Sequence, residues 1–161
     1  MAGAALGAAT VATGLIAGVF YAYATSVMLA LDDVDDRTFV EVMQRINTKI
    51  ENPVFFASFF GALALPVAAA GLRRRRGPGT AGRWIMVGFG CYLVAFVVTV
   101  AGNVPLNDDL ARAGDPALIA TIAAVRDDFE GRWVAWNVVR TVAATAAFGC
   151  LCRALTLHRS T

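Results

Sequence analysis

Four stretches of the chain are apolar enough, and long enough, to cross a membrane as helices. Residues 1–31, 52–72 and 84–107 contain no charged side chain, and each run exceeds the roughly 18–20 residues that a helix needs to span the hydrocarbon core. A fourth stretch, which starts at Trp133, is interrupted by a single charge at Arg140. The pattern predicts helical spans at about residues 6–30, 53–72, 84–104 and 133–153.

The two connections that hold the acidic residues show the periodicity of amphipathic helices. In the first connection, Thr38 and Glu41 have the spacing of a capping box at a helix N-terminus. In the second, Asp115 followed by Pro116 is typical of the start of a helix. The apolar positions that follow at helical spacing are Phe39, Val42, Met43, Ile46 and Ile50 in the first connection, and Leu118, Ile122, Val125 and Phe129 in the second. The sequence therefore predicts an all-α polytopic membrane protein, a four-helix bundle with two short amphipathic helices in its outer connections.

The composition agrees with a chain that is solvated largely by lipid. Hydrophobic residues make up 58% of the 161 positions and the mean hydropathy is +0.61, well above the values of soluble domains. The apolar start lacks the basic residues of a secretory signal and is longer than the apolar core of one. We therefore expect it to remain as the first span of a single membrane domain over residues 1–161, with the lipid bilayer as its main partner.

The charges divide unevenly between the connections. The segment from Arg73 to Arg83 and the C-terminal end hold seven of the 14 basic residues and no acidic ones, whereas the other two connections hold all 12 acidic residues. Basic residues near span ends mark the cytoplasmic side, so we expect both termini in the cytoplasm and the protein in the cell membrane. The run Arg73–Arg76 is interpreted in the same way, as a topogenic signal between two spans, and no nucleic-acid partner is expected.

The residue types that usually hold redox cofactors and metals are scarce. Cys91, Cys150 and Cys152 lie inside predicted spans without the spacing of a redox or zinc motif, and His158, the single histidine, lies in a basic tail. The spans contain neither paired histidines nor clustered carboxylates, and the chain has no glycine-rich nucleotide fingerprint. We therefore expect no haem, no flavin and no metal.

The fourth span carries an unusual set of polar and aromatic residues. Trp133, Trp136, Asn137 and Arg140 are spaced to lie on one helical face. An arginine at the centre of a membrane helix costs about 2.5–3.5 kcal/mol on insertion scales, so Arg140 is expected to face the protein interior. It either bonds to carbonyls and amides as a structural group or holds an anion or enolate, and a snorkelling arginine is the third reading. The tryptophans fit either an interfacial belt or the wall of a pocket.

Further polar side chains are expected near the same depth. Asn103 lies at the end of the third span, which Pro105 is expected to terminate, and Asn107 and Asp108 follow directly. Asn47 shares a helical face with apolar neighbours and so requires a buried partner.

Several of these segments together resemble the anthrone oxygenase-like integral membrane family, a domain family of mostly unknown function. The resemblance covers nearly the whole chain in order, and its most specific parts are the Asn-x-Pro-x-Asn and Trp-x-x-Trp-Asn-x-x-Arg elements. It implies a possible activity, because fungal polyketide members of the family oxidise anthrones to anthraquinones without an evident cofactor. The matching segments are Gly18-Val19-Phe20-Tyr21-Ala22, Arg37-Thr38-Phe39-Val40-Glu41, Gln44-Arg45-Ile46-Asn47, Asn52-Pro53, Asn103-Val104-Pro105-Leu106-Asn107 and Trp133 through Thr141.

The resemblance and the polar face together predict a pocket near the outer side of the membrane for a small lipophilic aromatic substrate. The residues expected to carry catalysis are Arg140, Asn103 and Asp108, with Asp108 as a base. Those expected to bind the ligand are Tyr21, Asn47, Asn107, Trp133, Trp136 and Asn137. The alternative is a non-catalytic membrane protein that binds a small lipophile or serves as a scaffold or accessory subunit, and a transporter ranks third. A homo-oligomer is compatible with either of the first two functions, and the sequence leaves the natural substrate open.

Overall fold

The computed structural model describes residues 1–73 and 79–159, and every regular element in them is a helix. Arg74–Arg76, part of the predicted topogenic arginine run, lie outside the described residues. In chain order the elements are α1 (Ala2–Ala22), the π-helical segment η1 (Tyr23–Val27), α2 (Met28–Asp32), α3 (Asp36–Ile50), α4 (Pro53–Arg73), α5 (Gly79–Val98), the π-helical segment η3 (Thr99–Asn103), α6 (Val104–Arg112) and α7 (Ile122–Arg159).

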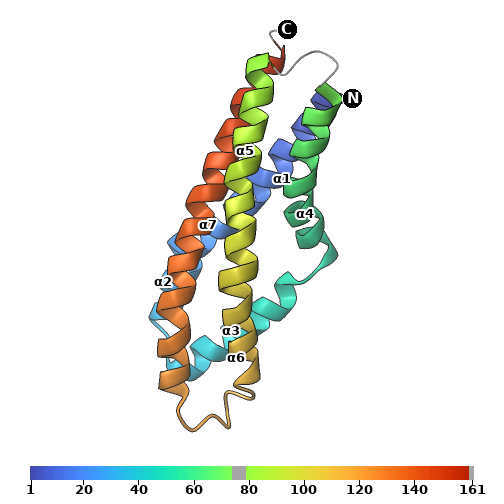
Figure 1. Cartoon of the computed structure of the whole chain (residues 1–161). Coiled ribbons are helices and arrows are strands. Elements are labelled where there is room, and N and C mark those ends of the chain that lie inside the picture. The colour runs from blue at the N-terminus through green and yellow to red at the C-terminus, as the bar shows by residue number, and fades with distance from the viewer. Residues whose placement is uncertain (74–78, 160–161) are drawn as a thin grey trace.

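Four of the resulting continuous helices are long and apolar enough to cross a membrane, which confirms the all-α membrane class. They run over Ala2–Asp32, Pro53–Arg73, Gly79–Arg112 and Ile122–His158. Helix α7 packs against α5 and α1, and α4 packs against α1 and α5, so that the four helices close a ring. Both chain ends lie at one end of the molecule, and α3 and α6 lie at the other (Figure 1), which we call the distal end.

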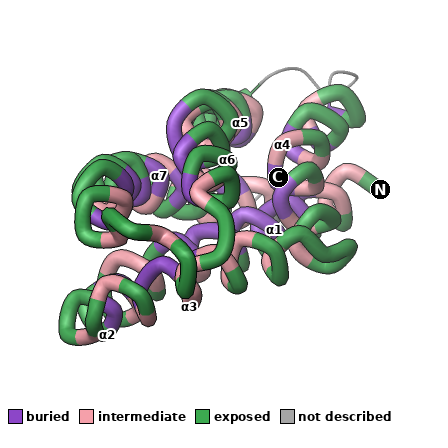
Figure 2. Tube along the Cα trace, turned by 90° about the horizontal axis from the view of Figure 1, so that it is seen from below, coloured by how far each residue is buried: buried purple, intermediate pink, exposed green. Residues whose placement is uncertain are grey.

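The interior is built largely from small and aromatic side chains. On α7 the buried positions Ala144, Ala147 and Leu151 continue a single stripe, and a Cβ added at Gly88 of α5 would stand 3.2 Å from the carbonyl oxygen of Ala147. Helices that approach this closely need glycine or alanine at the contact. The outward faces of the long helices remain exposed although they are apolar (Figure 2), as a protein solvated by lipid requires.

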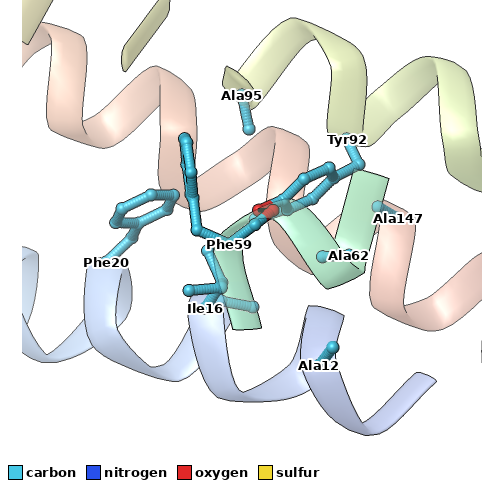
Figure 3. Close-up of a cluster of buried hydrophobic side chains, with 10 residues drawn as sticks. Ala12, Ile16, Phe20, Phe59, Ala62, Tyr92, Ala95 and Ala147 are labelled. Atoms are coloured by element: carbon cyan, nitrogen blue, oxygen red, sulfur yellow. Dashed lines mark hydrogen bonds between the residues drawn. The ribbon is translucent and has the colours of Figure 1, made fainter. Parts of the chain in front are cut away.

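A cluster of aromatic rings joins α4 to its neighbours in the middle of the structure. Phe59 stacks on Phe96 with ring centroids 5.1 Å apart, and the Tyr92 hydroxyl donates to the Phe59 carbonyl over 2.9 Å. Phe20 of α1 reaches the same cluster (Figure 3). Helix α4 begins with an asparagine cap. Asn52 Oδ1 accepts hydrogen bonds from the backbone N–H groups of Val54 and Phe55, and Pro53 occupies the first helical position, where its missing N–H is not needed.

The third long helix does not end at Pro105, contrary to the expectation from sequence. The chain stays helical through Pro105 to Arg112 because residues Thr99–Asn103 widen into a π-helical turn. Proline lacks an N–H group and its ring presses on the carbonyl four residues earlier. A π-helical turn just before the proline relieves that pressure and allows the helix to continue.

The second outer connection also differs from the expectation. Residues 113–121 form turns rather than a helix that starts at Asp115 and Pro116, and Leu118 is exposed. The apolar positions Ile122 and Phe129 instead belong to the first turns of α7. They are in phase with the buried stripe of the fourth span, so the segment folds as one long helix rather than as two.

Helix α3 begins at a different cap from the one expected. Asp35, not Thr38, is the N-cap: its carboxylate accepts from the backbone N–H of Thr38 over 3.1 Å and from the Thr38 hydroxyl over 2.6 Å. These hydrogen bonds, the side-chain one foremost, hold the pKa of the exposed Asp35 carboxyl below its usual value. Glu41, the expected capping-box partner, instead pairs with Arg45.

Arg126, near the start of α7, holds the corner between α2 and α3. Its buried guanidinium donates to the carbonyl oxygens of Leu31, Asp32 and Val34 and to the carboxylates of Asp36 and Glu130. It also lies 4.5 Å from the centroid of the Phe39 ring. All three nitrogens of the guanidinium are bonded, so this arginine is a structural anchor that ties α3 to α7.

Candidate functional site

A cavity of about 220 Å³ lies toward the distal end of the molecule. Its walls come from the end of α1 and η1, the last turns of α3, the first half of α4, the η3–α6 region and the middle of α7. The lining residues are Val19, Phe20, Tyr23, Ile46, Asn47, Ile50, Glu51, Phe55, Phe56, Phe59, Phe60, Thr99, Val100, Asn103, Val104, Asn107, Trp133 and Arg140.

Arg140 is the one cationic side chain among these lining residues. Only 6% of the residue is exposed, and its Nη2 donates to Asn137 Oδ1 over 2.9 Å. The guanidinium carbon lies 4.3 Å from the centroid of the Phe20 ring and 5.2 Å from that of Trp133. Within the described part of the chain no carboxylate forms an ion pair with it. The charge is therefore held by aromatic faces and one amide, without a counter-ion.

Two buried asparagines join the helices around Arg140. Asn137 donates from Nδ2 to the backbone carbonyl of Phe20 over 3.1 Å, so its amide connects α1 to the arginine. Asn103 donates from Nδ2 to the carbonyl of Trp133 over 3.2 Å, and the Trp133 indole donates to Asn107 Oδ1 over 2.9 Å. These bonds fix the positions of α1, η3 and α7 relative to one another at the level of the cavity.

Three buried polar atoms around the cavity have no hydrogen-bond partner among the described residues. They are Nε of Arg140, Nδ2 of Asn47 and Oδ1 of Asn103. Buried polar atoms left in this state cost about 1–3 kcal/mol each, and each one calls for an explanation, of which a missing ligand is one. Two of the three, Nε of Arg140 and Nδ2 of Asn47, are donors on residues of the same cavity wall, and one of them belongs to the buried cation, which suits the pair to an oxyanion.

The two π-helical segments among the described residues, η1 and η3, both contribute to the cavity wall. Tyr23 is the first residue of η1, and Thr99, Val100 and Asn103 belong to η3. A π-helical turn inserts one extra residue and so changes the direction in which the following side chains point. In η3 this places the short polar Asn103, which is fully buried, beside the backbone of Trp133.

One wall is formed by phenylalanines of α4. Phe55, Phe56, Phe59 and Phe60 occupy the first two turns of that helix and all line the cavity. Their rings contact one another, with Phe55 and Phe59 stacked at 5.5 Å. Phe59 also belongs to the buried core, in which it lies near Phe20 (Figure 3). The cavity thus combines an aromatic apolar wall with a cationic one.

The structure brings most of the predicted site residues together. Arg140, Asn103, Asn47, Asn107 and Trp133 line the same cavity. Asn137 lies directly behind it, bonded to Arg140.

Three predicted site residues lie elsewhere. None of them is in the cavity wall: Tyr21 is 59% exposed, Asp108 is exposed, and Trp136 is 42% exposed. Trp136 packs over Gly102, where an added Cβ would meet its ring at 3.0 Å. The four residues of the predicted polar face therefore divide: Trp133, Asn137 and Arg140 follow the buried stripe at intervals of three and four, and Trp136 faces outward beside it.

The structure adds three polar residues that the sequence analysis did not assign to the site, namely Tyr23, Thr99 and Glu51. The Thr99 hydroxyl donates to the Ala95 carbonyl over 2.8 Å. Tyr23 lines the cavity and its ring lies 5.5 Å from that of Trp133. Glu51, at the C-terminal end of α3, is the one carboxylate among the lining residues. The sequence spacing could have indicated Tyr23, because this residue continues the buried stripe of Thr13, Ile16 and Phe20 at helical intervals. Glu51 carries no comparable signal, since it follows the end of its helix.

The cavity is better suited to an anion than to a metal ion. In residues 1–73 and 79–159, no three His, Cys, Asp or Glu side chains come together as a metal site would require. The polar groups among the lining residues are one guanidinium, amides, an indole, a phenol, one aliphatic hydroxyl and one carboxylate. Apart from the carboxylate, groups of this kind can donate hydrogen bonds to an oxyanion.

The part of the chain that carries most of the cavity residues matches a known family model. The family model described as anthrone oxygenase matches residues 54–150, a segment that includes α5, η3, α6 and most of α4 and α7 with Asn103, Asn107, Trp133 and Arg140. The chain matches no curated protein and no solved structure.

Proposed function

The chain belongs to the anthrone oxygenase family, and on that premise we propose that its distal cavity binds a small lipophilic phenolic compound as an oxyanion and oxidises it with dioxygen. The observation that carries the proposal is the state of Arg140, which is buried at the cavity wall without a counter-ion and with Nε unbonded. An enolate oxygen placed there would supply the missing charge and an acceptor.

For an anthrone, the reaction needs no reductant beyond the substrate. The methylene carbon loses a proton to give an enolate, and Arg140 stabilises the negative oxygen. The electron-rich carbon then transfers electrons to dioxygen, and a C–O bond forms to give a hydroperoxide. Loss of the second C–H proton and cleavage of the O–O bond leave a carbonyl and water. Overall, CH₂ and O₂ become C=O and H₂O, with the substrate oxidised and dioxygen reduced.

The carboxylate best placed to accept the first proton is Glu51. It lines the cavity, whereas Asp108, the base expected from sequence, does not. A general base has to reach the proton that it removes. In the proposed mechanism Glu51 therefore takes the role expected for Asp108, at the wall formed by α3.

The test is oxidation of a hydroxylated anthrone by the purified protein in lipid nanodiscs. We expect one dioxygen consumed per anthrone oxidised, at a rate above that of empty nanodiscs, and label from ¹⁸O₂ in the new carbonyl group when the product is analysed promptly. Saturable binding of the anthrone without any acceleration of its oxidation would contradict catalysis and favour the alternative, a membrane protein that binds a small lipophile.

We further propose that the protein resides in the cell membrane with its termini and the α4–α5 connection in the cytoplasm, on the basis of the unequal charges. Single cysteines are introduced into a variant in which the three native cysteines are alanine. With an impermeant thiol reagent on intact cells, Asp33→Cys should be labelled and Thr80→Cys should be labelled only after lysis, since both positions are exposed. The reverse pattern would overturn the orientation.

A further inference from the structure

We infer that the cavity opens sideways into the bilayer, between α4 and the η3–α6 segment, and that its ligand enters from the lipid with any alkyl substituent left in that opening. The inference rests on the proposed function only in using the same cavity. It specifies a substrate class, phenols with an apolar extension that remain dissolved in the membrane.

The evidence is that some residues line the cavity and are also exposed on the outer face of the long helices. On α4 the residues of this kind are Phe60, which is 52% exposed, and Phe56, one turn earlier. On the η3–α6 segment they are Val100, which is also 52% exposed, and Val104, one turn later. A residue that belongs to both surfaces marks the rim where the cavity meets the surroundings. Between α4 and the η3–α6 segment all four rim residues are apolar, whereas the remaining exposed lining residue, Glu51, lies at the end of α3.

The packing of α4 explains why the opening lies at this level. Ring contacts join α4 to α5 through Phe59, Phe60 and Phe96. One turn beyond Phe96 the chain reaches Val100, in the π-helical segment where the helix is displaced. The exposed rim therefore begins next to the ring contacts between the two helices, on the side nearer to the distal end.

The cation of the cavity belongs to α7, which contributes no rim residue. Arg140 and Trp133 come from α7, and Asn103 is fully buried. A ligand entering between α4 and η3 would pass an apolar rim before its oxygen reached the guanidinium. This arrangement suits a molecule that is already in the hydrocarbon region and ionises only inside the site.

The size of the cavity favours a ligand that extends beyond it. Its volume of about 220 Å³ lies below the roughly 300–1,000 Å³ typical of pockets that enclose drug-sized ligands. A small ring system can be held against Arg140, but a long substituent has to leave through an opening. An apolar rim permits this at no cost in lipid, because the chain remains in a hydrocarbon environment.

Photo-crosslinking provides a direct test that needs no turnover. The probe is a dihydroxyanthraquinone with a long alkyl chain and a diazirine on the chain carbon nearest the ring, incorporated into proteoliposomes that contain the whole protein. Labelled residues are identified by peptide mass spectrometry, with excess dihydroxyanthraquinone as competitor. We expect competitor-sensitive labelling of the α4 rim at Phe56 or Phe60 and of the opposite rim at Val100 or Val104.

A matched pair of variants tests the route. Val100→Trp puts a large ring in the opening and should reduce rim labelling several-fold. Val97→Trp adds the same ring one turn away, at a position equally exposed (52%) but outside the cavity wall, and should leave labelling unchanged. Labelling concentrated on α3 at Ile46–Glu51 would show entry from the aqueous side and overturn the inference, as would the absence of competitor-sensitive labelling. Rim labelling without anthrone oxidation would support the opening while the proposed catalysis failed, so the two outcomes are separable.

Discussion

Replacing Arg140 by methionine is expected to lower kcat for anthrone oxidation by about 10²–10³-fold, the loss measured when one oxyanion-stabilising donor is removed from an enzyme. The reason is that Arg140 is the one cation in the cavity wall and has an unbonded nitrogen available for the substrate oxygen. The rate is measured as dioxygen uptake in nanodiscs, after subtraction of the spontaneous oxidation in empty nanodiscs.

The methionine variant should still fold, so the loss of activity can be assigned to the site. Removing the charge saves about 2.5–3.5 kcal/mol of insertion cost, while the Asn137 oxygen that loses its donor costs about 1–3 kcal/mol. Arg140→Lys keeps the charge but not the planar fork of donors, so its activity should also fall. Activity equal to wild type in both variants would exclude Arg140 from the mechanism. Failure of both to accumulate in the membrane would make it a structural residue.

The second large effect is expected at Arg126, and it concerns stability. Arg126→Met removes the hydrogen bonds that hold Leu31, Val34 and Asp36 to α7. We expect a destabilisation of about 3 kcal/mol, the lower end of the range for breaking a buried ion pair, because the carboxylate partners keep contact with solvent. For a chain of this length, that lowers the Tm of the solubilised protein by about 6–12 °C.

Arg132→Met is the matched control for both arginine variants. It removes the same side chain from the same helix, but in the described part of the chain Arg132 forms an ion pair only with Asp128, over 3.5 Å, and both side chains are largely exposed. Its effect on stability should stay within about 0.5 kcal/mol, and its activity should equal that of wild type. Equal shifts in Tm for the Arg126 and Arg132 variants would show that the α2–α3 corner does not depend on its buried guanidinium.

The membrane class and the family could be predicted from the sequence because both depend on long, strong signals. Charge-free runs identify helices that lipid can solvate, and the spacing of Trp133, Asn137 and Arg140 identifies a polar face that has to be buried. The polar positions recur with the period of an α-helix, so a regular helix places them on one face. The apolar positions from Ile122 to Leu151 also predict one helix, provided that they are treated as a single stripe.

The errors arise where local geometry departs from a regular helix or depends on a distant neighbour. Pro105 is accommodated by a π-helical turn, which the hydrophobic periodicity of the sequence does not predict. Trp136 is within the angular range of the polar face but covers Gly102 of another helix. The cap of α3 was assigned to Thr38, whose hydroxyl instead donates to Asp35. Each of these depends on a competing partner that only the assembled structure supplies.

The anchoring by Arg126 has a mechanical consequence for the cavity. Arg126 ties α3 to α7, and Arg140 lies on the same uninterrupted helix, 14 residues and about 21 Å farther along at 1.5 Å per residue. The N-terminal end of α3 and the cationic wall are thus fixed to the same helix. Helix α4 follows α3 directly after Glu51 and Asn52 and is not held by this anchor; it packs against α1 and α5. A ligand larger than the cavity is then expected to displace the phenylalanines of α4 rather than the cationic wall.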